Sequence, residues 1–151
     1  MLLAYRLPRE PSTPRSSLWR KLRRLGAAQL LDGLAALPLD ARNREQLEWL
    51  ADEVTEAGGE ATLWVGELSS GAQERELAAR MAESVAAEYR DVTEDAGAAQ
   101  AEPPGQRRRT LARLRRELRR IRARDYFPPP ERDQAQRAVE ELAALVEEQV
   151  A

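Results

Sequence analysis

The sequence of 151 residues contains no cysteine and no histidine. Disulfide bonds are therefore excluded, and so are metal sites that use thiolate or imidazole ligands. Nucleophilic catalysis by a Cys–His or Ser–His–Asp arrangement is excluded for the same reason, as is acid–base catalysis by histidine. We expect a protein that is not an enzyme, binds no metal and needs no cofactor.

Long apolar runs are also missing. No segment reaches the ~18 consecutive apolar residues of a membrane span, and the apolar run over residues 2–7 is too short for a signal peptide. We therefore expect a cytoplasmic protein without a membrane segment. Aromatic residues amount to only 5% of the chain, so Leu, Ala and Val must fill most of the core. We expect Trp19, Trp49 and Trp64 in the core or at its edge, not as platforms for base stacking.

Residues 1–70 alternate between strand and helix signals. Thr13-Pro14 is typical of a helix start, and Asp40 predicts a second one. Asp32-Gly33 lies between two apolar runs and predicts a hairpin turn. The expected elements are a strand over 2–7, a helix from 13 to about 25, a hairpin over 27–39, a helix over 41–57 and a strand over 61–68. This β-α-β-β-α-β order is that of the ferredoxin-like fold, a four-stranded antiparallel sheet with two helices on one face.

Residues 71–151 show helical patterns only. A helix is predicted over 71–93, and the small and proline-rich composition of 96–106 indicates a flexible linker. Two further helices over 107–150 are separated by a proline run and predict a helical hairpin. The sequence thus predicts an α+β protein with a ferredoxin-like domain over 1–70 and a helical region over 71–151.

The strongest charge feature lies in the second half of the chain. Between Arg107 and Arg124 there are ten arginines and a single acid, Glu117. Apolar residues at helical spacing predict one buried seam, which consists of Leu111, Leu114, Leu118 and Ile121. The arginines that point most directly away from this seam are Arg109, Arg113, Arg116 and Arg120. Guanidinium groups arrayed along a helix attract phosphates, so we interpret these four as nucleic-acid contacts.

A second basic patch lies on the helix that starts at Thr13. Its leucines face the predicted sheet, so Arg20, Arg23 and Arg24 face solvent and are further candidates for phosphate contacts. An ordinary solvated face is the alternative for this patch. For the arginine-rich helix the alternative is internal pairing with acidic helices, among them the residues Glu140 and Glu141. Both interpretations stay open for both patches.

Three arginines surround the predicted start of the first helix. Arg6, Arg9 and Arg15 form a candidate site for a small oxyanion, because free N–H groups at a helix start attract anions. The alternative is an arginine-rich loop that is tied to Glu10 or Glu67.

Several motifs occur in the order that a known family shows. They are Tyr5-Arg6-Leu7-Pro8-Arg9-Glu10-Pro11-Ser12, Leu18-Trp19-Arg20-Lys21-Leu22, Leu25-Gly26-Ala27, Asp32-Gly33, Leu37-Pro38, Gly58-Gly59-Glu60-Ala61 and Arg122-Ala123-Arg124-Asp125-Tyr126-Phe127. On these motifs the chain resembles the ChrB chromate-resistance proteins over nearly its whole length. It departs from them at Leu34-Ala35-Ala36, where the family more often has an aromatic residue. ChrB proteins typically continue into a second domain that this sequence does not contain, so we expect a stand-alone N-terminal domain.

The resemblance implies a chromate-responsive regulator of a chromate-efflux operon that acts on promoter DNA. The candidate partners are promoter DNA, chromate as an oxyanion effector and a second copy in a homodimer. The alternative function is a module that binds a protein partner or oligomerises through its helical half. A nuclease is not expected, because Cas2-type nucleases with this fold place an acidic metal ligand near the position of Arg6, whose charge repels a divalent cation.

Overall fold

The computed structural model describes residues 1–151 and divides into two compact units, Met1–Leu77 and Ala78–Ala151. The boundary lies within the helix α3 (Gly71–Ala99). The predicted boundary after residue 70 thus falls inside the first unit. Each unit has its own core and is described by itself.

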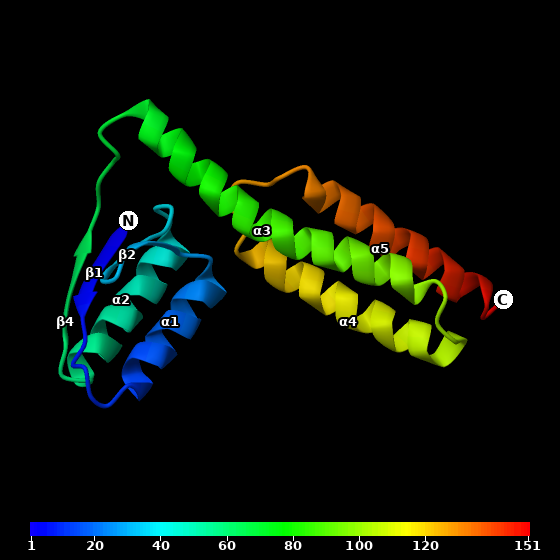
Figure 1. Cartoon of the computed structure of the whole chain (residues 1–151), viewed down its shortest axis with the longest axis horizontal. Coiled ribbons are helices and arrows are strands. Elements are labelled where there is room, and N and C mark those ends of the chain that lie inside the picture. Colours follow the sequence, from blue (N-terminus) through cyan, green and yellow to red (C-terminus); the bar gives the residue numbers. More distant parts are fainter. The chain divides into compact units, whose positions relative to one another are not determined.

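The first unit is a four-stranded sheet with two helices. Its elements are β1 (Leu2–Arg6), α1 (Thr13–Leu25), β2 (Ala28–Leu31), β3 (Leu34–Ala36), α2 (Ala41–Glu56) and β4 (Glu60–Trp64). The strand order is β2-β3-β1-β4, and every neighbouring pair is antiparallel. In Figure 1 both helices cover the same face of this sheet. The α+β class and the antiparallel sheet that the sequence predicts are therefore confirmed.

The register of the central strand explains which face is buried. Leu3 of β1 lies opposite Ala35 of β3 and Leu63 of β4, and Leu3 and Ala35 are fully buried. Residues directly opposite each other in a sheet share a face, so this row points to the helices. The helices contribute the buried residues Leu18, Leu22, Leu47, Leu50 and Val54, which form the apolar stripes of α1 and α2.

The turns and caps follow the local sequence. The carboxylate of Asp40 accepts a hydrogen bond from the backbone N–H of Asn43 at 2.7 Å, as expected for an N-cap. Gly26 ends α1 with φ of 80°, a left-handed conformation that favours glycine. The hairpin turn at Asp32-Gly33 lies against β1: Tyr5 N–H donates to the Gly33 carbonyl at 2.8 Å, and a Cβ on Gly33 would come within 2.5 Å of the Tyr5 carbonyl oxygen. A side chain at Gly33 would therefore force β1 and the turn apart.

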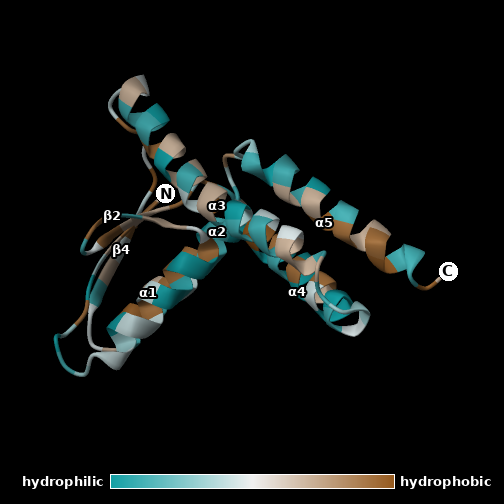
Figure 2. Ribbon diagram, turned by 45° about the vertical axis from the view of Figure 1, so that its right-hand side comes forward, coloured by the Kyte–Doolittle hydropathy of each residue, from teal (hydrophilic) through white to brown (hydrophobic).

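The second unit is a bundle of α3, α4 (Pro104–Ala123) and α5 (Glu131–Glu148). Figure 2 shows that hydrophilic and hydrophobic residues alternate along these helices. All three helices contribute to one buried cluster of Val85, Tyr89, Val92, Ala96, Ala99, Leu111, Leu114, Leu118, Ile121, Ala135, Val139, Leu142 and Ala143. Because Ala and Val supply the smaller members and Tyr89 is the one aromatic residue, the helices can approach closely.

The predicted linker over 96–106 is wrong. The helix expected to end at residue 93 continues to Ala99, because Ala96 and Ala99 are buried and extend the stripe of Tyr89 and Val92. Pro104 is the first residue of α4, where a helix needs no N–H donor. Only residues 100–103 connect the two helices.

No helix combines the length and the apolar composition that crossing a lipid bilayer requires.

Candidate nucleic-acid interface

Helix α4 positions the arginines through its buried seam. Leu111, Leu114, Leu118 and Ile121 are all buried, as their spacing predicts. The seam fixes the rotation of α4 against α3 and α5, since all three helices share one core. Every other position of α4 is then either at the edge of a helix contact or turned to solvent.

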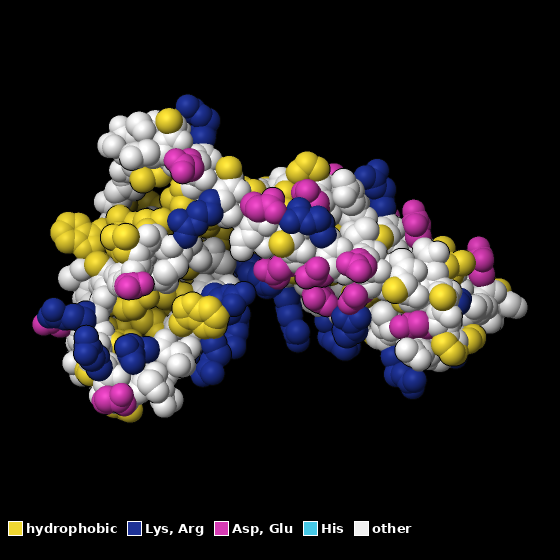
Figure 3. All heavy atoms as spheres, viewed as in Figure 1, with side chains coloured by type: hydrophobic (Ala, Val, Ile, Leu, Met, Phe, Trp, Pro, Cys, Tyr) yellow, Lys and Arg dark blue, Asp and Glu magenta, His cyan; other side chains and the backbone are white.

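Three of the four predicted phosphate contacts on α4 are unpaired. Arg109, Arg116 and Arg120 are exposed, and no ion pair involves them. They recur at intervals of seven and four residues, so they lie along one side of the helix. Figure 3 shows basic side chains gathered along the edge of this unit where α4 lies, next to acidic side chains that gather over α3. These three guanidinium groups are free to bind a polyanion.

The fourth predicted contact, Arg113, is paired within the bundle. Its guanidinium donates to Asp95 of α3 at 2.9 Å and to Glu117 at 3.2 Å. Arg124 likewise pairs with Glu88 of α3. The two arginines that reach α3 are therefore paired internally, whereas Arg109, Arg116 and Arg120 form no ion pair.

The acids of α5 are not the partners of this helix. No ion pair joins α4 to Glu140 or Glu141; the closest link is Arg122, which donates to Gln136 at 2.9 Å. Gln136 in turn donates to Glu140 at 2.6 Å.

Arg107 has a structural role at the start of α4. Its guanidinium donates to the carbonyls of Ala99, Gln100 and Glu102, at 3.3, 2.6 and 3.0 Å. These carbonyls belong to the end of α3 and the turn after it, where a helix leaves acceptors unsatisfied. Arg107 thus caps α3.

The arginines of α1 are exposed, as the sequence predicts. Arg20, Arg23 and Arg24 all face solvent, and the guanidinium of Arg23 lies over the ring of Trp19, 4.8 Å from its centroid. This is the geometry of a cation–π contact, which holds Arg23 against the helix surface.

The expectation that the three tryptophans belong to the core or its edge is wrong. Trp19, Trp49 and Trp64 are 51%, 58% and 59% exposed. On α1 and α2 the face toward the sheet is filled by leucines and Val54, so an indole beside that stripe points outward. Trp64 ends β4 with its indole N–H donating to the exposed Thr62 hydroxyl at 2.9 Å.

The predicted oxyanion residues do not converge on one cavity. Arg6 pairs with Glu60 of β4 at 2.8 Å, on strands that lie side by side, and not with Glu10 or Glu67. Arg15 donates to the carbonyl of Arg9 at 2.9 Å, and the side chain of Arg9 is exposed. Arg15 lines a cleft together with Arg20, whereas Arg6 lines a separate shallow depression over β1 and β4.

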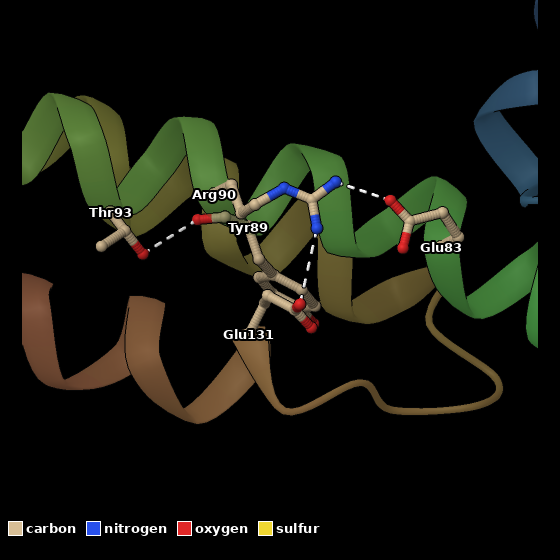
Figure 4. A network of polar contacts seen from close by, with 5 residues as sticks. All are labelled: Glu83, Tyr89, Arg90, Thr93 and Glu131. Atoms are coloured by element: carbon tan, nitrogen blue, oxygen red, sulfur yellow. Dashed lines mark hydrogen bonds and ion pairs between the residues drawn. The ribbon is translucent and has the colours of Figure 1, made fainter.

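A polar network links α3 to the segments around α5. Figure 4 shows Arg90 reaching Glu83 on its own helix and Glu131 at the start of α5, at 2.6 and 3.4 Å. The hydrogen bond to Glu83 raises the pKa of the Arg90 guanidinium above its ordinary value. The Tyr89 hydroxyl donates to Asp125 at 2.8 Å, and burial, followed by this bond, raises the pKa of Tyr89 above its ordinary value. The sequence pattern did not single out either contact.

No group of three or more acidic residues is arranged to hold a metal ion.

The family model described as "Protein ChrB, N-terminal" matches residues 15–104, which is more than half of the 151 residues. The matched segment runs from α1 through α3 to the first residue of α4, so the free arginines of α4 lie outside it. No curated protein and no solved structure matches the chain.

Proposed function

Because the chain belongs to the ChrB N-terminal family and is thereby related to chromate resistance, we propose that it is a regulatory protein without catalytic activity that binds promoter DNA through α4. Arg109, Arg116 and Arg120, three of the exposed arginines of α4 that form no ion pair, are the residues that would contact phosphates. Their exposure on a helix whose opposite side is buried is the observation that supports the proposal.

Charge and rigidity both favour DNA as the partner. Unpaired guanidinium groups on one helix repel each other. Binding of an anionic partner such as DNA reduces this repulsion and is therefore favourable. A helix anchored by four buried apolar residues holds these groups without the entropic cost of ordering a flexible tail. Phosphate contacts of this kind give affinity with little sequence preference, so base selection has to come from other residues.

The first unit supplies further parts of the proposal. Arg20, Arg23 and Arg24 offer a second exposed basic face, and chromate is the proposed effector. We also assign this unit to the ferredoxin-like fold. The strand order β2-β3-β1-β4, with two helices on one face, supports that assignment.

A protein-binding or oligomerising module is the second candidate function, with the helical half as its surface. The pairing of Arg113 and Arg124 with acids of α3 favours it, because it neutralises part of the basic charge. In this case the bundle would bind a protein or a second copy of the chain, and DNA would not compete with that partner for the surface.

The test is a comparison of two variants with the same net charge. R109Q/R116Q/R120Q removes three of the exposed arginines of α4 that form no ion pair; the control R42Q/R75Q/R137Q removes three exposed arginines that also form no ion pair and lie on α2, α3 and α5. We expect the first variant to lose most of its affinity for a promoter duplex and the control to keep it, measured by fluorescence anisotropy. Equal affinity of the two variants, or no binding by the unmodified protein, would contradict the proposal.

A further inference from the structure

A cleft with a volume of about 700 Å³ lies beside α1 in the first unit. One wall is a stripe of α1 with the residues Ser12, Arg15, Ser16, Trp19 and Arg20. Their spacing of three and four residues places them on one side of the helix, next to the leucine stripe that faces the sheet. The volume lies in the range of small-molecule sites, which is roughly 300–1,000 Å³.

One part of this wall is suited to an anion. Arg15 uses one N–H for the carbonyl of Arg9 and keeps the rest of its guanidinium, while Arg20 forms no ion pair. The hydroxyls of Ser12 and Ser16 take no part in the side-chain hydrogen bonds of the protein. Two guanidinium groups with adjacent hydroxyl donors are the groups that bind phosphate oxygens.

The same wall carries an aromatic ring. Trp19 lines the cleft and is 51% exposed, and Arg23 lies over one face of its indole. Arg23 occupies one face of the indole, so a flat ring would stack on the other face. Stacking of a base on an aromatic side chain contributes about 1–3 kcal/mol per base.

The opposite wall supplies polar groups from the sheet. The Tyr5 hydroxyl accepts a hydrogen bond from the Gln29 amide at 2.9 Å, and the same amide donates to the Leu31 carbonyl at 2.7 Å. These bonds hold both side chains in place, and the Tyr5 hydrogen can still be donated to a ligand. The carboxylate of Asp32 also lines the cleft and takes no part in an ion pair, so it can accept from an amino or hydroxyl group.

We propose that this cleft binds a nucleoside phosphate. The phosphate contacts Arg15, Arg20 and Ser16, and the base stacks on Trp19. Asp32 accepts a hydrogen bond from the sugar or from the base. The nucleotide is either free or an unpaired nucleotide of a nucleic acid strand. The inference does not rest on the proposed DNA surface of α4, which belongs to the other unit.

The tryptophans provide the readout. In a W49F/W64F background Trp19 is the only tryptophan, so its fluorescence reports on the cleft alone. We expect AMP to quench this fluorescence saturably, and to bind at least about tenfold more tightly than adenosine or inorganic phosphate, because each of these lacks one of the two contacts. Failure of both AMP and a single-stranded oligonucleotide to give saturable quenching would overturn the inference.

Two matched variants test the residues. R15Q/R20Q should weaken AMP binding by about tenfold or more, because each lost guanidinium removes a charge-assisted bond. R42Q/R75Q removes two exposed arginines that do not line the cleft and should bind AMP like the unmodified protein. Equal affinities of the two variants would overturn the inference. R20Q alone keeps the bond from Arg15 to Arg9 and serves as a second variant should R15Q/R20Q fold poorly.

Comparison of the ligands separates the sources. Tighter binding of AMP than of the oligonucleotide identifies a free nucleotide as the ligand, and the reverse identifies a nucleic acid strand. Either result supports the proposed site if the binding depends on Arg15 and Arg20. R109Q/R116Q/R120Q should leave AMP binding unchanged, so the cleft and the α4 surface can fail independently.

Discussion

At the scale of single residues, the contact between Tyr89 and Asp125 connects α3 to the segment after α4. Tyr89 is fully buried and donates to one carboxylate oxygen of Asp125, while the other oxygen of Asp125 is buried without a hydrogen-bond partner. The Tyr89 hydroxyl is therefore the only hydrogen-bond donor to the Asp125 carboxylate. A buried acceptor that loses its donor costs about 1–3 kcal/mol.

We predict that Y89F lowers the free energy of unfolding at pH 7 by about 1–3 kcal/mol, since the ring stays and only the hydroxyl is lost. Urea denaturation followed by circular dichroism measures the difference. Unchanged stability of Y89F would show that the hydroxyl contributes nothing to the bundle.

The same pair should depend on pH in a defined direction. Burial raises the pKa of Tyr89 above its ordinary value near 10, so the folded protein keeps the proton at a pH where the unfolded chain loses it. The stability that this group contributes is fully present below pH ~10 and is lost as the pH rises through the raised pKa of the folded state. The difference between the protein and Y89F should therefore narrow above pH ~10, and a constant difference would contradict this account.

The sequence only partly predicts which side chains are buried, paired or exposed. The buried seam of α4 follows from spacing alone, because period and hydrophobicity decide which side of a helix packs. The pairing of Arg113 with Asp95 could not be predicted, since it depends on the register of α4 against α3. The exposure of Trp19 could not be predicted either. Its ring is covered on one face by Arg23, a contact that composition does not reveal.

At the scale of elements, α4 shows where sequence reasoning succeeds and fails. Because Pro and Gly usually indicate a break, the sequence predicts that the helix begins at residue 107, whereas α4 begins at Pro104, inside the predicted linker. Here Pro104 begins the helix and Arg107 bonds the end of α3, so the two helices follow each other closely. The hairpin of β2 and β3 was predictable because Asp-Gly between apolar runs selects a two-residue turn.

Arg113 and Arg124, the C-cap residue of α4, should differ from the three unpaired arginines in their effect on stability. We predict that R113Q/R124Q lowers the free energy of unfolding by about 1 kcal/mol, since both side chains pair with α3 and both pairs are partly exposed. R109Q/R116Q/R120Q should leave the melting temperature unchanged or raise it, because it removes unpaired like charges. Thermal unfolding followed at 222 nm distinguishes the two variants. A marked loss of stability in the triple variant would mean that these arginines are paired after all, which favours the protein-binding function.

At the scale of the whole molecule, the chain consists of two units that each present exposed arginines. The family match covers most of the first unit and the α3 part of the second, while the free arginines of α4 lie beyond it. The fold class could be predicted because each element carries its own local signal. The boundary between the units could not, since it lies inside the continuous helix α3.

The central claim is that Arg109, Arg116 and Arg120 bind DNA phosphates, and the salt dependence of binding tests it most directly. Each phosphate contact releases about 0.9 of a counterion, so three contacts contribute about 2.7 to the slope of log affinity against log salt concentration. We predict that R109Q/R116Q/R120Q binds a promoter duplex with a slope shallower by about 2.7, whereas R42Q/R75Q/R137Q keeps the original slope. Equal slopes for the unmodified protein and R109Q/R116Q/R120Q would contradict the claim.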